Sequence, residues 1–129
     1  MHKLLLIVPD ASLRQLYHEL LVNRQIEVMP VATIEDAILL LSVYQFKMIV
    51  IYVDPLNEKS AITFITLRKK LAKWLKAKLV ILTSGLDMPE SNLYYDDLVL
   101  NPLHLSPVEL TETIQLSLKK NFSSGKTAV

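Results

Sequence analysis

The stretch Lys47-Met-Ile-Val-Ile-Tyr-Val-Asp54 decides the fold of this chain. Residues 48–53 are all apolar or aromatic, and no polar residue alternates with them. Such a run predicts a β-strand covered on both faces, as strands are in the parallel sheets of α/β domains. Pro55 ends it, because proline cannot continue a central strand. Ligands of open parallel sheets bind at the carboxyl ends of the strands, so Tyr52 and Asp54 are the first functional candidates.

Other apolar runs predict strands on the same grounds, and amphipathic segments between them predict helices. The expected strands are 4–8, 26–31, 47–53, 78–83 and 98–100. The expected helices are 11–24, 33–44, 62–74, a short one near Met88, and one that begins at Ser106. Residues 57–60 are expected to form a loop. This alternation predicts a doubly wound parallel sheet of the (βα)5 type.

Polar residues before the helical segments predict where three of these helices begin. Asp10 or Ser12 can cap the first helix and Thr33 the second, because their side chains accept bonds from the free amides of a first turn. Ser106 followed by Glu109 predicts a capping box at the last helix.

Length and composition limit the function classes. The 129 residues suit one domain, which we expect to span 1–121, with 122–129 as a polar tail. Two glycines exclude a glycine-rich phosphate loop, and the lack of cysteine excludes disulfides and thiolate zinc sites. No segment has the length of a membrane span or the pattern of a signal peptide, so we expect a cytoplasmic location. The net charge of +1 favours no particular partner.

The residues at the ends of the expected strands carry a family resemblance. The first strand leads into Pro9-Asp10, the third into Tyr52-Val53-Asp54-Pro55, the fourth into Thr83-Ser84 and the fifth into Asn101-Pro102. In element order, strand spacing and these ends, residues 3–120 resemble the receiver domain of bacterial response regulators, the CheY-like fold.

That resemblance implies a phosphorylation pocket of fixed composition. It implies an acidic pair after strand one that holds magnesium, and a phosphorylated aspartate after strand three. A hydroxyl after strand four and a lysine after strand five would contact the phosphate. Such a set is needed because an aspartyl phosphate gathers several negative charges in one place.

The sequence departs from this pattern at most positions. Pro9 replaces the first acid, so only Asp10 remains of the pair, and Asn101 replaces the lysine, whereas Thr83 keeps the hydroxyl. Asp10 is then a metal ligand in one interpretation and a helix cap in the other, and we favour the cap. Leu98 stands where the family has an aromatic switch residue.

The phosphoacceptor position is open between two registers. Phe46-Lys47 followed by four apolar residues places Tyr52 there, which we favour; a strand two residues longer places Asp54 there. Tyr52 and Asp54 lie two apart, so both are expected beside the pocket. Asp10 and Asp54 remain as weak magnesium ligands, and magnesium is expected only if Asp54 is phosphorylated.

Three functional hypotheses follow. The first is a degenerate receiver: a non-catalytic signalling module, not an enzyme, that acts by protein–protein contact without normal aspartyl phosphorylation. The alternative is a phosphorylatable receiver that uses Asp54. The third is a flavodoxin-like nucleotide or cofactor binder, which the lack of a glycine-rich turn argues against. The resemblance implies a histidine kinase or a larger regulator as partner.

Two surface features also invite interpretation. The last helix turns Leu110, Ile114 and Leu118 inward. We expect a two-fold dimer through residues 98–118, because exposed apolar surface marks interfaces. Its expected face consists of Leu98, Leu103, Leu105, Val108 and Leu116.

A run of basic residues covers the end of the third expected helix. It consists of Arg68, Lys69, Lys70, Lys73, Lys76 and Lys78. Such a run is typical of a solvated helix face with cations near the C-terminus. A near-neutral net charge and the lack of a DNA-binding motif argue against nucleic acid as a ligand. The spacing of Trp74 from Leu67 and Leu71 predicts that all three face the core.

Overall fold

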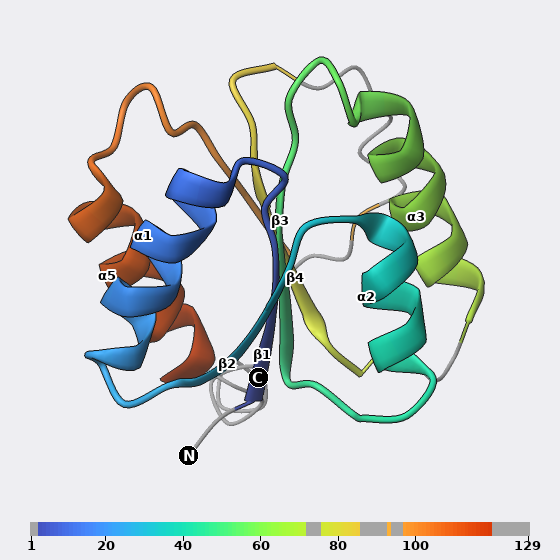
Figure 1. Cartoon of the computed structure of the whole chain (residues 1–129), viewed down its shortest axis with the longest axis horizontal. Coiled ribbons are helices and arrows are strands. Elements are labelled where there is room, and N and C mark those ends of the chain that lie inside the picture. The colour runs from blue at the N-terminus through green and yellow to red at the C-terminus, as the bar shows by residue number, and fades with distance from the viewer. Residues whose placement is uncertain (1–2, 72–75, 86–92, 94–96, 120–129) are drawn as a thin grey trace, which may run out of the picture.

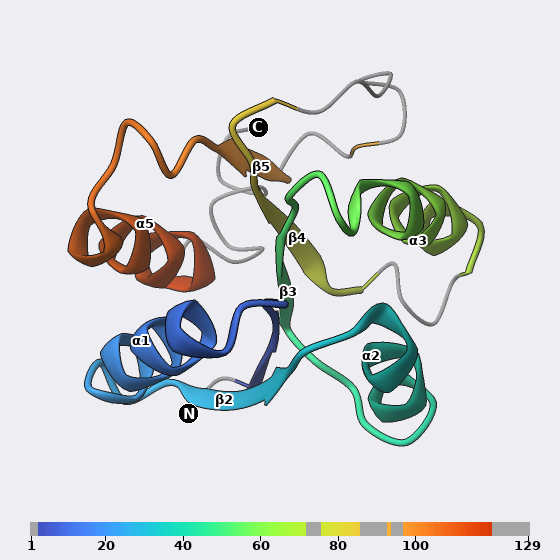
Figure 2. The same cartoon turned by 45° about the horizontal axis from the view of Figure 1, so that its top comes forward.

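The computed structural model describes residues 3–71, 76–85, 93 and 97–119, and these form one parallel sheet between two layers of helices (Figure 1). The strands are β1 (Lys3–Ile7), β2 (Glu27–Val31), β3 (Met48–Tyr52), β4 (Lys78–Leu82) and β5 (Leu98–Leu100). The described helices are α1 (Ala11–Val22), α2 (Ile34–Leu41), α3 (Glu58–Lys70) and α5 (Pro107–Lys119). The five strands lie in the order β2-β1-β3-β4-β5, as the tilted view of Figure 2 shows. The predicted fold class is confirmed.

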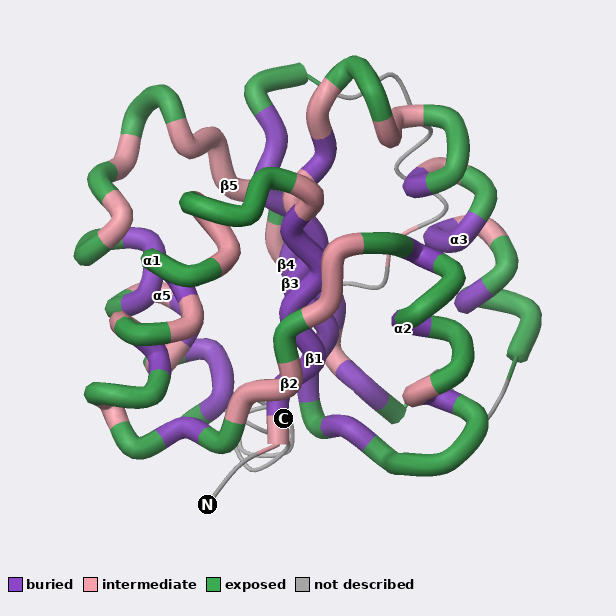
Figure 3. Tube along the Cα trace, viewed as in Figure 1, coloured by how far each residue is buried: buried purple, intermediate pink, exposed green. Residues whose placement is uncertain are grey.

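The three central strands are buried on both faces, which is why their sequences are apolar without alternation (Figure 3). Helices α1 and α5 cover one face, and α2 and α3 cover the other (Figure 1). The residues facing α2 and α3 are Leu5, Ile7, Ile49, Ile51, Leu79 and Ile81. Those facing α1 and α5 are Leu4, Leu6, Met48, Val50, Val80 and Leu82. Burial of this apolar surface supplies the main driving force for folding.

Three predicted helix starts are confirmed. Asp10 accepts a bond from the amide three residues on, at 3.0 Å, and Thr33 does the same at 3.1 Å. Ser106 and Glu109 form a reciprocal capping box, with distances of 2.8 and 3.1 Å. These contacts fix the residue at which each of these helices begins.

Among the described helices, none is long and apolar enough to cross a membrane.

The prediction for α3 was wrong in start and in phase. The helix begins at Glu58 rather than after a loop over 57–60. Its buried residues are Ala61, Phe64, Ile65 and Arg68, whereas Leu67 and Leu71 are exposed. The error has a physical cause: a buried arginine occupies the core-facing stripe, so a stripe read from apolar residues alone is displaced. Trp74, the short helix near Met88 and the tail 122–129 lie outside the described residues.

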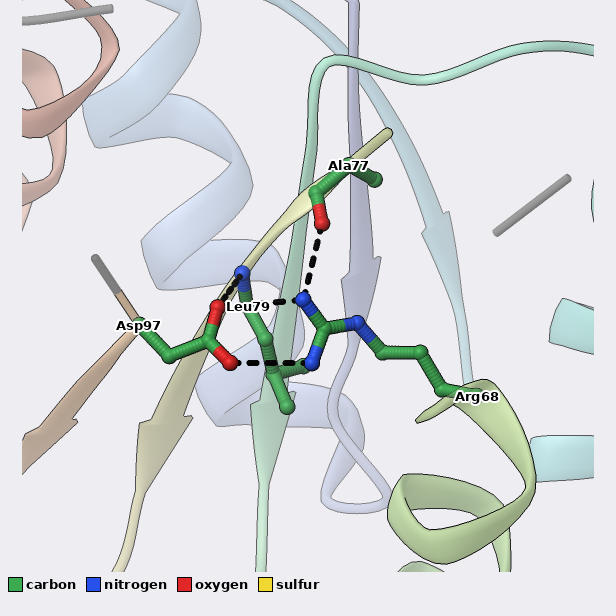
Figure 4. Close-up of polar contacts among 4 residues, drawn as sticks. All are labelled: Arg68, Ala77, Leu79 and Asp97. Atoms are coloured by element: carbon green, nitrogen blue, oxygen red, sulfur yellow. Dashed lines mark hydrogen bonds and ion pairs between the residues drawn. The ribbon is translucent and has the colours of Figure 1, made fainter. Parts of the chain in front are cut away.

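Arg68 forms a buried ion pair with Asp97 (Figure 4). The two side chains are 1% and 0% exposed. Nη1 of Arg68 lies 2.9 Å from Oδ2 of Asp97, and Nη2 lies 3.0 Å from Oδ1. Nη2 also donates to the carbonyl of Ala77 at 3.0 Å, and Oδ1 accepts from the amide of Leu79 at 3.0 Å. One pair of side chains therefore joins α3, the start of β4 and the residue before β5.

The prediction that the basic run forms a single solvated helix face was therefore wrong. Arg68 is buried, and Lys78 reaches the opposite layer, where its Nζ donates to the carbonyl of Ser117 on α5 at 2.6 Å. Lys69, Lys70 and Lys76 are exposed, and Lys73 lies outside the described residues.

We predict that Arg68→Ala lowers the free energy of unfolding by about 3–5 kcal/mol, because it leaves a buried carboxylate without its guanidinium. The double change Arg68→Met with Asp97→Leu should cost clearly less than the sum of the two single changes, since both charges leave together. Urea denaturation of the wild type, Arg68→Ala, Arg68→Met, Asp97→Leu and the double variant measures this. Lys70→Ala, on the exposed side of the same helix, is the control and should change stability by less than about 0.5 kcal/mol. Additive effects of the two single changes would contradict the prediction.

Candidate functional site

The carboxyl ends of the strands meet at one edge of the sheet, at the top of Figure 1. The structure brings to this edge all five residues of the predicted pocket, because each ends or follows a strand. They are Asp10, Tyr52, Asp54, Thr83 and Asn101. The pairing of Tyr52 with Leu82, and the bond from the Thr83 amide to the Leu100 carbonyl at 2.9 Å, hold β3, β4 and β5 level at this edge.

The turn after β1 is closed by its own side chains. Asp10 caps α1 through Oδ1. Nη1 of Arg14 donates to the carbonyls of Val8 and Pro9, at 2.8 and 3.2 Å, and so covers the end of the strand. The cap interpretation of Asp10 therefore holds, and one of its carboxylate oxygens is already used.

The turn after β3 is closed by Asp54 and Asn57 together. Oδ1 of Asp54 accepts from the amides of Leu56 and Asn57, at 2.9 and 3.1 Å. In return, Oδ1 of Asn57 accepts from the Asp54 amide at 2.8 Å, and its Nδ2 donates to the Tyr52 carbonyl at 3.0 Å. Sequence reasoning missed Asn57, although an aspartate and an asparagine three residues apart before a helix are typical of such turns. Asp54 lies in this turn, beyond the last residue of β3, so strand alternation does not orient it.

Tyr52 is the last residue of β3; it is half-buried and packs against the core cluster between the sheet and α1 and α5. Its ring centre lies 6.4 Å from that of Tyr17, which projects from α1, with the planes tilted by 42°. Burial, and secondarily the nearby Tyr52, raise the pKa of Tyr17 to about 12. The side chain at this position therefore fills space as part of an aromatic pair.

The side chains of Thr83 and Asn101 also form hydrogen bonds with the backbone of the loops that follow them. The buried hydroxyl of Thr83 lies 3.1 Å from the carbonyl oxygen and 3.2 Å from the amide nitrogen of Gly85. Oδ1 of Asn101 accepts from the Leu103 amide at 2.9 Å. Both contacts are side-chain turns of the kind that these residue types form at strand ends.

The residues at this edge do not fit the magnesium ion that the resemblance implies. Magnesium prefers near-octahedral oxygen ligands with one or more carboxylates. Pro9 and Tyr52 offer no carboxylate, and Asp10 and Asp54 each bind backbone amides. Within the described part of the chain, no three His, Cys, Asp or Glu side chains are grouped so that they could hold a metal ion.

Comparisons with known proteins place the fold. No family model matches the sequence, and no curated protein matches it. Solved structures do match. The chemotaxis response regulator CheY4 of Vibrio cholerae superposes with a TM-score of 0.73 at 20% identity, covering 91% of this chain and 98% of that one. A sensor protein from Polaromonas superposes with a TM-score of 0.76 at 12% identity, covering 95% and 97%. An orphan response regulator of H. pylori gives 0.71 at 15%, covering 91% and 96%.

The fold is that of a CheY-like receiver domain. At these identities the comparisons show the fold alone.

The five residues of the predicted interaction face differ in how far they are exposed. Leu103, Val108 and Leu116 are exposed, and Leu103 is 79% exposed. Leu98 and Leu105 are half-buried and pack against the core under α1 and α5, so they offer less surface to a partner than the other three.

We predict that the Tyr17 phenol ionises near pH 12 instead of its ordinary 10.0. The unfolded chain loses this proton at the lower pH, so the Tyr17 contribution to stability is complete below about pH 10 and is lost as the pH rises toward 12. The difference in ultraviolet absorbance between wild type and Tyr17→Phe, recorded from neutral pH upward, measures the ionisation. Urea midpoints should fall more steeply over the same range in the wild type than in Tyr17→Phe. A difference curve centred at the ordinary tyrosine pKa would contradict the buried pair.

Proposed function

We propose that this chain is a non-catalytic signalling module with a receiver fold, which acts through protein–protein contact and is not switched by aspartyl phosphorylation. The observation that carries the proposal is the side chain that ends β3. It is Tyr52, whose ring lies against Tyr17 rather than offering a carboxylate to a phosphoryl group.

The neighbouring residues support the same proposal. Phosphoryl transfer to an aspartate needs positive charge around the transferred group, from a metal ion and a cationic side chain. Asn101 is neutral where the resemblance implies a lysine, and Pro9 removes one of the two acids that would hold the metal. Thr83 alone supplies no charge. In this proposal the module is not an enzyme and needs no cofactor.

A second candidate, a phosphorylatable receiver that uses Asp54, rests on one observation. Asp54 lies two residues beyond the end of β3 and is half-buried at the carboxyl edge of the sheet. Against it stand the two backbone amides that Oδ1 of Asp54 already binds, because phosphorylation would turn this carboxylate into an acyl phosphate whose neutral carbonyl oxygen accepts those bonds less strongly.

We predict that incubation with magnesium and acetyl phosphate leaves the intact mass unchanged, and that beryllofluoride leaves the amide spectrum unchanged. A response regulator that reacts with acetyl phosphate, treated in parallel, shows that the reagents are active. Asp54→Asn is the matched variant and should behave like the wild type. An adduct on Asp54 that this substitution abolishes would replace the first proposal with the second.

We also propose that the chain forms a two-fold dimer through residues 98–118. Leu103, Val108 and Leu116 are exposed on this face, and Val99 of the edge strand β5 joins them. An exposed apolar patch beside a strand edge favours association with a second copy.

We predict that the wild type sediments as a dimer at high micromolar concentration and that Leu116→Glu is monomeric, because the substitution puts a charge in the apolar patch. Sedimentation velocity and equilibrium runs measure both proteins. Leu16→Glu, on the outer side of α1, is the control and should leave the association unchanged. A monomeric wild type, or a dimer indifferent to Leu116→Glu, would contradict the prediction.

A further inference from the structure

The outer side of α3 carries a hollow that the core does not use. It is open to solvent, has a volume of about 330 Å³, and is lined by Ile62, Thr63, Thr66, Leu67 and Lys70. Figure 1 shows α3 as the outermost element beside α2, with one side against the sheet and the other away from it. The hollow therefore lies on the surface of a helix whose opposite side is committed to the core.

The apolar residues of this hollow, Ile62 and Leu67, are not among the buried residues that hold α3 to the sheet. Ala61, Phe64, Ile65 and Arg68 make that contact. Leu67, on the other side, is 39% exposed, and Leu71 beyond the helix end is exposed to a similar degree. An apolar residue inside a surface hollow gains stability when another apolar side chain covers it.

The charge around the hollow is positive. Lys70 lines it, and Lys59 is exposed in the first turn of the same helix. From Lys59 to Lys78 the sequence contains no acidic residue. Beyond its first residue, the outer side of α3 itself therefore carries lysines and no acid, and it complements a segment that carries carboxylates.

The arrangement favours a protein segment over nucleic acid. Nucleic-acid sites line up cations along a groove and add aromatic rings on which bases stack. Here Arg68 is buried with Asp97, and Lys78 is bound to α5, so neither adds charge to this face. The described residues that line the hollow are aliphatic, threonine or lysine, and none is aromatic.

We infer that the outer face of α3 docks an acidic amphipathic segment of a partner protein. An apolar side chain of that segment enters the hollow between Ile62 and Leu67, and a neighbouring carboxylate meets the ammonium group of Lys70. This is the recognition mode in which an amphipathic helix lays its apolar side into a groove. The inference does not depend on whether Asp54 accepts a phosphoryl group, because α3 lies beside that edge and not in it.

The test is a titration of the full chain with designed probes, followed by amide NMR spectra. The first probe is a peptide of about four helical turns, with leucine at the core-facing positions and glutamate elsewhere. The second replaces each glutamate by lysine, the third replaces each leucine by serine, and the fourth is a single-stranded oligothymidine. We expect only the first to shift amide signals, with the shifts centred on residues 62–70 and weaker at high salt.

Variants of the chain locate the site. We expect Leu67→Asp and Lys70→Glu each to weaken binding of the first probe by about ten-fold. Leu67→Asp puts a charge inside the hollow, and Lys70→Glu reverses the sign of the charge beside it. Leu16→Asp is the matched control for Leu67, because Leu16 is 40% exposed on α1. Lys119→Glu is the control for Lys70, since both lysines end a helix. Both controls should bind as the wild type does.

Three outcomes would overturn the inference. They are no shifts at millimolar peptide, shifts centred away from α3, and equal losses in the control variants. Preferential binding of the oligothymidine, abolished by Lys70→Glu, would assign the face to nucleic acid instead. Circular dichroism of each variant shows that loss of binding is not loss of fold.

Discussion

The ion pair between Arg68 and Asp97 holds together three elements that the rest of the structure relies on. Arg68 projects from α3, Asp97 immediately precedes β5, and both bind backbone groups at the start of β4. β5 has three residues and lies at the edge of the sheet, so few backbone bonds fix its register. The carboxylate of Asp97 adds a bond to the Leu79 amide ahead of the first strand pair. Because desolvating two charges is costly, this pair is stable only with such a complete set of partners.

The register that this ion pair helps to fix also matters at the opposite end of β4 and β5. The amide of Thr83 binds the carbonyl of Leu100 there, so the register set near Asp97 also sets how Thr83 and Asn101 stand at the carboxyl edge. At that edge polar groups become available, since the three central strands are buried on both faces. In this chain those groups are used to start helices and close turns. The CheY-like receiver fold is thus retained, while the described side chains at this edge bind the backbone of their own turns. The proposal of a non-catalytic module therefore looks to the outer surfaces of the helices for function.

The sequence was informative where one physical effect dominates. Unbroken apolar runs predicted the central strands, because a strand without polar residues is favoured only where both of its faces are buried. Caps such as Asp10 and Ser106 could be predicted because a helix start needs local acceptors. Arg68 could not be placed, because its burial depends on Asp97, twenty-nine residues away in sequence. The same limit applies to Leu105, which packs on the core because of where the turn after β5 runs. Tyr52 was correctly placed at a strand end, but its contact with Tyr17 requires knowing that α1 lies over that end of β3.

The central claim is that individual residues, and not the fold, separate this chain from a phosphorylatable receiver. The most direct measurement is to restore those residues together, as Pro9→Asp, Tyr52→Asp and Asn101→Lys, and to follow the intact mass with magnesium and acetyl phosphate. Tyr52→Phe serves as the control, because it keeps the ring and adds no carboxylate. The account predicts that the restored protein gains the mass of one phosphoryl group on residue 52, while the control does not. A folded restored protein that gains no phosphoryl group would contradict the account, as would labelling of the control to the same extent.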